Sequence, residues 1–134
     1  MGAHKRADLQ CKTNLVWTDL KAENFVVMQD FSNGEKLHAK GIDLESAMPY
    51  RDNPVDYSPE SCPPEFASAF LQGNGPFFEL DFFYDIWPYG IFLYELATGE
   101  GAFDGKTPAQ VTKKVEDPRL RKLIKSCLRK DPQR

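Results

Sequence analysis

The chain has 134 residues, a formal net charge of −3 and aromatic side chains at 13% of its positions. This length suits one domain or a piece of a larger one, and the aromatic content predicts a substantial buried core. Acidic and basic residues are interspersed along the chain. The composition therefore gives no sign of a nucleic acid or an anionic membrane as the partner.

The N-terminal residues and the cysteines indicate the compartment. The first dozen residues are polar and mixed in charge, which predicts the frayed end of a helix, and they contain no apolar run of a secretory signal. Cys11, Cys62 and Cys127 are far apart and show no metal-ligand spacing. We therefore expect free thiols and an intracellular protein, with the cytoplasm as the simplest compartment.

A β-hairpin is predicted in the first third of the chain. Phe25–Met28 has the composition of a short strand, an Asn-Gly pair at 33–34 signals a turn, and Leu37–Leu44 can return as the second strand. This hairpin would hold Asn24 just before one strand and Asp43 at the end of the other. Two oxygen-bearing side chains would then face a common spot.

The middle of the chain is predicted to be a loop followed by a short helix. Five prolines punctuate residues 49–64, which are too short and too mixed in composition for a disordered linker. Glu65–Leu71 is expected to form a short helical turn, and Gly73 and Gly75 should end it.

The most apolar stretch predicts a buried central helix. From Ile86 to Leu96, only Pro88, Gly90 and Glu95 interrupt the apolar and aromatic residues. The stretch is too short and too charged to span a membrane, so it belongs in the middle of a domain. With Asp85 as the N-cap, Pro88 falls in the first turn, where a missing N–H costs nothing. The Asp85 carboxylate could then hold the backbone of another segment.

Two further helices are predicted near the C-terminus. Thr107 and Pro108 open one of them, with threonine as the N-cap and Gln110 as the reciprocal cap. Pro118 opens the other, and its apolar residues recur at the spacing of one buried stripe. The stripe comprises Leu120, Leu123, Ile124, Cys127 and Leu128. The sequence therefore predicts a mostly α fold, with helices around a buried central helix and a small β-hairpin.

The order of several short motifs resembles the C-terminal lobe of a protein kinase. Residues 19–24 read DLKAEN, which is similar to the D-L-K-P-E-N catalytic loop of that superfamily. Residues 43–45, reading DLE, stand in the place of the D-F-G metal motif. Residues 63–65, reading PPE, stand where A-P-E closes the activation segment.

The second half of the chain continues the resemblance. Residues 85–90, reading DIWPYG, resemble D-x-W-S-x-G at the start of the family's central helix. Residues 99–103 resemble the T-G-x-x-P-F loop, and residues 128–132 resemble the L-x-x-D-P ending. Each motif alone is weak, and their order and spacing together carry the resemblance.

The resemblance implies a transferase that uses ATP and Mg²⁺ to phosphorylate Ser or Thr of a protein substrate. It implies that Asp19 accepts the proton of the substrate hydroxyl and that Lys21 steadies the transferring phosphate of ATP. Asn24 and Asp43 would hold Mg²⁺, which prefers oxygen ligands. Asp85 would bond the backbone of the catalytic loop near residues 17–19. Without these ordered motifs, Asp19 and Asn24 would be interpreted as turn or cap residues.

Several positions depart from the family pattern. Trp17 and Thr18 replace the usual His-Arg pair, which removes the cation that reads a phosphate on the activation loop, although Trp17 could fill the space of the histidine. Glu45 replaces a glycine and adds a β-carbon where the family uses backbone freedom. Glu65 would pair with an arginine after the D-P ending, and Arg134 is one position early for that spacing.

The family's N-terminal lobe has no counterpart in these residues. The sequence contains no Gly-rich phosphate loop, no strand lysine for the phosphates and no helix glutamate to pair with it. We therefore expect residues 1–134 to be a partial kinase domain, a C-lobe without the N-lobe and the last helix, and inactive by itself. Two alternatives remain: a pseudokinase that docks a protein partner without turnover, and a truncated product whose exposed core binds chaperones.

Overall fold

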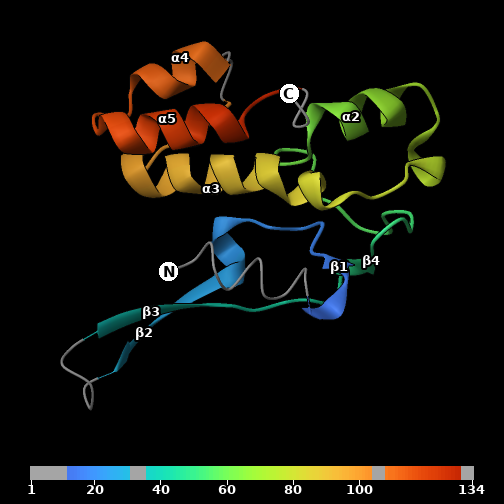
Figure 1. The fold of residues 1–134 in the computed structure, drawn as a ribbon, viewed down its shortest axis with the longest axis horizontal. Coiled ribbons are helices and arrows are strands. Elements are labelled where there is room, and N and C mark those ends of the chain that lie inside the picture. Colours follow the sequence, from blue (N-terminus) through green and yellow to red (C-terminus); the bar gives the residue numbers. More distant parts are fainter. Residues whose placement is uncertain (1–11, 31–35, 104–107, 131–134) are drawn as a thin grey trace.

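Helices and two small antiparallel sheets make up the chain in a computed structural model, which describes residues 12–30, 36–103 and 108–130 (Figure 1). The first sheet pairs β1 (Leu15–Val16) with β4 (Met48–Pro49), and the second pairs β2 (Phe25–Asp30) with β3 (Lys36–Gly41). The described part is thus a mixed α and β fold. Within it, no helix is both long and apolar enough to cross a bilayer.

The predicted central helix is confirmed as α3 (Ile86–Thr98), which follows a 3₁₀ turn, η4 (Phe82–Asp85). Pro88 lies in the first turn of α3, as expected. Asp85 occupies the predicted N-cap position, and its side chain makes no capping bond to α3 itself. Asp81 instead caps the 3₁₀ turn by accepting a hydrogen bond from the Phe83 amide.

The main core lies between α3 and two helices that cover it, α4 (Pro108–Lys113) and α5 (Pro118–Cys127) (Figure 1). Burying each large side chain of this core stabilises the fold by about 1.5–3 kcal/mol. The buried residues are Trp87, Ile91, Tyr94, Ala102, Val111, Val115, Ile124 and Leu128. This cluster holds α3 in place against α4 and α5.

The α3 and α5 backbones approach closely at Gly90. A β-carbon built at Gly90 would lie 2.6 Å from the Cβ of Cys127 and 3.0 Å from a methyl group of Leu128. A distance of 2.6 Å is far inside ordinary contact, so only glycine fits at this crossing without movement of one helix.

The C-terminal helices begin where the prolines predicted. Helix α4 starts at Pro108, and its expected cap, Thr107, lies outside the described residues. Helix α5 starts at Pro118 and is capped by Asp117, whose carboxylate accepts from the amides of Arg119 and Leu120. Of the predicted stripe, Ile124, Cys127 and Leu128 are buried and Leu120 is partly buried. The prediction for Leu123 is wrong, since this side chain is exposed.

The predicted hairpin is confirmed, with β2 and β3 in register from the pair Phe25–Gly41 to the pair Asp30–Lys36. Its Asn-Gly turn lies outside the described residues. The second strand ends at Gly41 and not at Leu44, so Asp43 follows the strand instead of ending it. Phe25 fastens the base of the hairpin to the central helix by stacking on Phe92, with ring centroids 4.5 Å apart.

A second core cluster joins the short β1–β4 sheet to the segments before α3. Its buried members are Val16, Phe66, Leu80 and Tyr84. Phe66 comes from α2 (Pro64–Leu71), which agrees with the predicted helical turn, and a further 3₁₀ turn, η3 (Gly75–Phe77), follows it. This cluster holds the residues around Trp17 to Lys21 against the N-terminal end of α3.

Candidate active site

The backbone before Asp19 is pinned to the central helix by the buried carboxylate of Asp85. Its Oδ2 accepts a hydrogen bond from the Trp17 amide at 2.9 Å, and its Oδ1 accepts one from the Thr18 amide at 3.1 Å. Asp85 is only 2% exposed, so these charge-assisted bonds replace the water that burial removes. The predicted bonds between Asp85 and this loop are confirmed.

This anchoring supports a strained turn. Thr18 has a φ of 66°, a left-handed conformation that is rare for a β-branched residue. Such a conformation costs of order 1–3 kcal/mol and persists only where the surroundings enforce it. The two bonds to Asp85 hold the backbone in this conformation, directly before Asp19.

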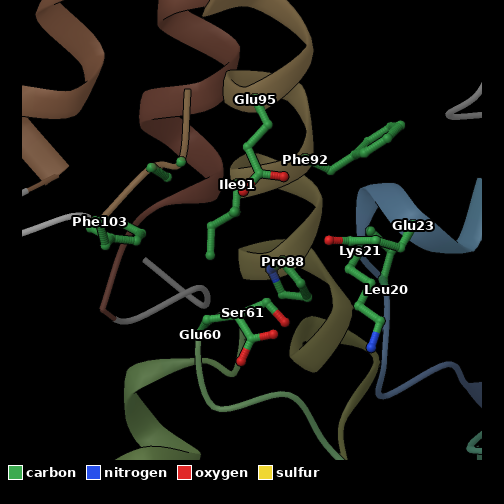
Figure 2. A pocket seen from close by; sticks show the side chains of 12 residues that line it. Leu20, Lys21, Glu23, Glu60, Ser61, Pro88, Ile91, Phe92, Glu95 and Phe103 are labelled. Atoms are coloured by element: carbon green, nitrogen blue, oxygen red, sulfur yellow. The ribbon is translucent and has the colours of Figure 1, made fainter. Parts of the chain in front are cut away.

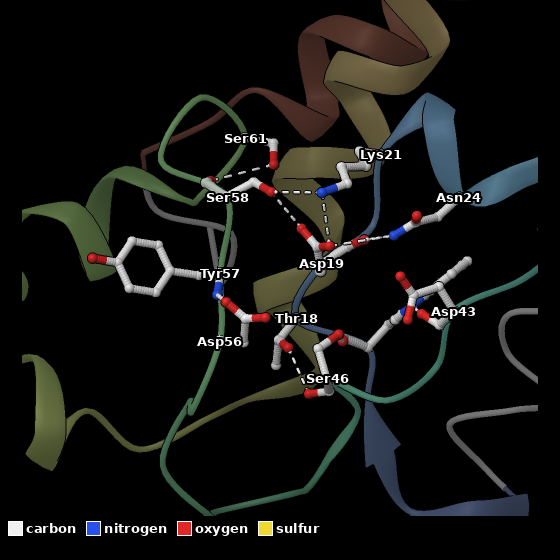
Figure 3. Close-up of polar contacts among 11 residues, drawn as sticks. Thr18, Asp19, Lys21, Asn24, Asp43, Ser46, Asp56, Tyr57, Ser58 and Ser61 are labelled. Atoms are coloured by element: carbon white, nitrogen blue, oxygen red, sulfur yellow. Dashed lines mark hydrogen bonds and ion pairs between the residues drawn. The ribbon is translucent and has the colours of Figure 1, made fainter.

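Asp19 lies in a three-membered polar network with Lys21 and Ser58 (Figure 3). The Ser58 hydroxyl donates to Oδ1 of Asp19 at 2.5 Å, and the Lys21 ammonium lies 2.9 Å from Oδ2. Lys21 also donates to the Ser58 oxygen at 3.0 Å. The lysine and the serine thereby hold the carboxylate of Asp19 in one orientation.

The network fixes the charge states of its two ionisable groups. Burial raises the pKa of Asp19, but hydrogen bonds from Ser58, Lys21 and Asn24 and the charge of Lys21 together outweigh it, so the pKa is lowered. The hydrogen bond to Asp19 raises the pKa of Lys21, and the charges of Glu23 and Glu60 add to this. At neutral pH the site therefore presents a carboxylate beside an ammonium.

Asn24 is buried beside Asp19, at the end of the 3₁₀ turn η1 (Ala22–Asn24). Its amide nitrogen donates to the backbone carbonyl of Asp19 at 2.9 Å and to the Asp19 carboxylate at 3.3 Å. These two bonds occupy the nitrogen and leave the amide oxygen to face another group. The Asn24 carbonyl also accepts from the Ile42 amide at 2.9 Å, which ties the backbone just before Asp43 to Asn24.

Asp43 has an exposed side chain and a left-handed backbone with a φ of 57°. Its carbonyl accepts a hydrogen bond from the Trp17 indole N–H at 3.1 Å. Within residues 12–30, 36–103 and 108–130, no three His, Cys, Asp or Glu side chains gather in a way that could hold a metal ion. A cation bound by Asp43 and the Asn24 oxygen would therefore need other ligands, such as phosphate oxygens or water.

Trp17 stands at the position where the family pattern has histidine, and it packs into the core. Its ring is buried and lies 5.3 Å from that of Phe25, centroid to centroid. The Trp17 ring also packs against Gly41 at the end of β3, where a β-carbon would lie 2.8 Å from the ring. Glu45 does not need the backbone freedom of a glycine, since the non-glycine residues at positive φ in the described part are Asn14, Thr18, Asp43 and Arg51.

A cavity of about 410 Å³ lies next to Lys21, between the 19–24 loop, residues 60–61 and α3 (Figure 2). Its apolar lining includes Pro88, Ile91 and Phe103, and the carboxylates of Glu23, Glu60 and Glu95 also line it. Burial raises the pKa of Glu95, and the charges of Glu23 and Glu60 raise it further. This concentration of negative charge disfavours an anionic group in the cavity.

Ser58 is the residue of this site that the sequence did not reveal. It lies 39 positions from Asp19 in a loop rich in prolines, and its neighbours give no spacing signal. In the sequence, Ser58 is marked only by its place a few residues before the PPE motif, which does not indicate a contact with Asp19. The expectation that Glu65 lacks the family's arginine partner stays untested, because Arg134 lies outside the described residues.

Comparison with known proteins supports the kinase resemblance in part. No family model matches the chain. The chain is 30% identical over 132 residues to the G2-specific protein kinase nim-1 of Neurospora crassa and 27% identical over 141 residues to the G2-specific protein kinase nimA of Emericella nidulans. It is distantly similar to these kinases. The alignments cover 87% and 92% of the chain but only 14% and 18% of the two relatives, so the chain spans less than a fifth of their length.

Proposed function

We propose that the chain is the C-terminal, catalytic-loop half of a Ser/Thr protein kinase domain. The observation that carries this proposal is the network in which Lys21, Ser58 and Asn24 all bond the Asp19 carboxylate and lower its pKa. The distant similarity to two protein kinases supports the same reaction class. Phosphoryl transfer demands mainly positioning and charge neutralisation, and this site offers both.

In the proposed reaction, Asp19 orients the acceptor hydroxyl of a protein substrate and takes up its proton. The lowered pKa keeps Asp19 ionised at neutral pH. Ser58 bonds Oδ1 of Asp19, while Oδ2 lies beside Lys21. Lys21 places a positive charge beside the acceptor, where it would offset negative charge on the transferring phosphoryl group. Mg²⁺ and ATP would supply charge neutralisation and the phosphoryl group.

Asn24 and Asp43 are the proposed metal ligands. The donor set fits a hard cation, since it consists of one amide oxygen and one carboxylate. The bonds from Asn24 to Asp19 leave the amide oxygen for this role, and the bond between Ile42 and Asn24 keeps the two segments together.

The groups that bind the ATP phosphates are proposed to lie in an N-terminal lobe outside these residues. Several apolar side chains of the hairpin and the segment after it are exposed, among them Val27, Met28, Leu37 and Leu44. An apolar surface of this kind marks a contact site for another protein part. We propose that it packs against that lobe, and that the 134 residues alone transfer no phosphate.

The second candidate is a pseudokinase that docks a protein partner without turnover. The substitutions that favour it are Trp17, Thr18 and Glu45. Trp17 is buried and Glu45 adopts no positive φ, so neither substitution speaks against catalysis. The intact network around Asp19 makes the kinase the better-supported proposal.

A transfer assay tests the proposal. The chain alone, and the chain joined to an N-terminal kinase lobe, are incubated with labelled ATP, Mg²⁺ and a generic Ser/Thr protein substrate. We expect no transfer from the chain alone and transfer from the joined protein. Nucleotide binding by the joined protein without any transfer would instead favour the pseudokinase.

A further inference from the structure

Two hydroxyl groups join the catalytic loop to the segment that follows Asp43. The Thr18 hydroxyl donates to the Ser46 carbonyl at 2.8 Å (Figure 3). The Ser46 hydroxyl donates in turn to the Trp17 carbonyl at 3.0 Å. Thr18 is buried and Ser46 is half-buried, so water competes only weakly for these bonds. The two bonds form a reciprocal clasp between segments almost thirty residues apart.

The clasp closes a short turn that carries Asp43. Within this turn the Ala47 amide donates to the Leu44 carbonyl at 3.0 Å. The Trp17 indole N–H bonds the Asp43 carbonyl at the start of the turn, and the clasp bonds Ser46 near its end. Residues 17 and 18 therefore hold both ends of the turn, and every donor and acceptor involved is neutral.

We propose that Thr18 and Ser46 are positioning residues, which hold the Asp43 turn against the catalytic loop without any phosphate group. The inference rests on the proposed function in so far as Asp43 serves as a metal ligand. Thr18 carries no charge, so it supplies no cation that could bind a phosphate on the activation loop, and its hydroxyl is used in the bond to Ser46. The turn is thus ordered by the chain's own hydroxyls. Each lost bond should favour its opening by about 2- to 10-fold.

Hydrogen exchange of the full chain tests the clasp directly. Thr18→Val and Ser46→Ala each remove one hydroxyl, and the matched control Ser126→Ala removes one from the exposed face of α5. We expect amide exchange in residues 43–47 to rise by about 2- to 10-fold in the first two variants, with exchange in α3 unchanged. Thr18→Ser keeps the hydroxyl and should exchange like the original chain.

Unchanged exchange in residues 43–47 of both Thr18→Val and Ser46→Ala would overturn the proposal. If Thr18→Val does not fold, Ser46→Ala decides the matter alone, because Ser46 has no strained backbone.

A Mn²⁺ titration separates this proposal from the proposed function. Mn²⁺ broadening of amide signals near Asn24 and Asp43 should weaken by a similar factor in both clasp variants and disappear in Asp43→Asn. Faster exchange in the variants without any Mn²⁺ effect in the original chain would uphold the clasp and contradict the metal role of Asp43. Mn²⁺ binding that depends on Asp43, together with unchanged exchange in both clasp variants, would contradict the clasp and uphold the metal role of Asp43.

Discussion

At the scale of single residues, the molecule is organised by the groups around the Asp19 carboxylate. Ser58 and Lys21 bond its two oxygens, and Asn24 bonds both the carboxylate and the backbone carbonyl of the same residue. Burial alone would favour the protonated acid, so the ionised form depends on these partners. Removing one partner should therefore be measurable as a change in pKa.

The first prediction concerns Ser58→Ala. Losing the hydroxyl should raise the pKa of Asp19, because burial then meets fewer opposing bonds. A carboxyl with a lowered folded pKa stabilises the fold above its unfolded pKa and loses this contribution as pH falls through the folded value. The stability cost of Ser58→Ala should thus be present at neutral pH and shrink in acid.

Titration of the Asp19 carboxyl carbon by NMR measures the pKa, and urea unfolding across pH measures the stability. Ser126→Ala is the control, since its hydroxyl bonds a carbonyl in α5 and faces no carboxylate. An unchanged Asp19 pKa in Ser58→Ala would show that the serine plays no part in setting the charge.

A second prediction concerns Asp85, whose carboxylate accepts from two consecutive buried amides. Asp85→Asn replaces one acceptor oxygen by a donor that faces an amide N–H, so it should lower the free energy of unfolding by about 1.5–3 kcal/mol. Urea unfolding checks this against Asp56→Asn, which changes an exposed aspartate that accepts from its neighbour's amide. Equal effects in the two variants would contradict the anchoring role of Asp85.

At the scale of elements, α3 contacts the loop before Asp19, the hairpin and α5. Trp17 and Thr18 bond the N-terminal end of α3 through Asp85, and the hairpin stacks on the side of α3 through Phe92. The opposite side of α3 is covered by α5 (Figure 1). A shift of α5 would therefore be transmitted through α3 to the site.

Gly90→Ala tests this crossing. The new methyl group would lie 2.6 Å from the Cβ of Cys127, so one helix must move, and overpacking of this kind typically costs 1–3 kcal/mol. Gly101→Ala is the control, because a β-carbon there meets nothing within 4 Å. Thermal unfolding should separate the two variants clearly, and equal midpoints would mean that the helices are not in close contact.

At the scale of the whole molecule, one face of the hairpin leaves apolar side chains exposed. Val27 pairs with Ala39 and Gln29 pairs with Leu37, so Val27 and Leu37 lie on the same face. Their exposed fractions are 67% and 69%. A surface of this kind favours association when its partner is absent.

The double variant Val27→Lys/Leu37→Lys should reduce self-association of the chain in light scattering while leaving its thermal unfolding nearly unchanged. Leu71→Lys introduces the same kind of charge at another exposed apolar residue and serves as the control. Association that responds to Leu71→Lys and not to the hairpin variant would place the contact surface on α2.

The sequence predicted the elements better than their contacts. The apolar run and Pro88 identified the central helix, and the need to satisfy a buried carboxylate at its mouth led to the bonds with residues 17 and 18. Ser58, Ser46 and the approach of Gly90 to Cys127 were not predicted, because each depends on partners 28 to 39 residues away. The strand end at Gly41 was missed because Ile42 and Leu44 continue the apolar pattern after pairing stops.

The proposed role of Asp19 in phosphoryl transfer is tested most directly in the chain joined to an N-terminal kinase lobe. Asp19→Asn should lower the rate of labelled phosphate transfer by at least about 100-fold, the usual contribution of a general base, and leave ATP binding intact. Asp56→Asn, an exposed aspartate, should transfer phosphate like the original protein. Transfer that continues undiminished in Asp19→Asn would contradict the assignment of this carboxylate as the group that receives the substrate proton.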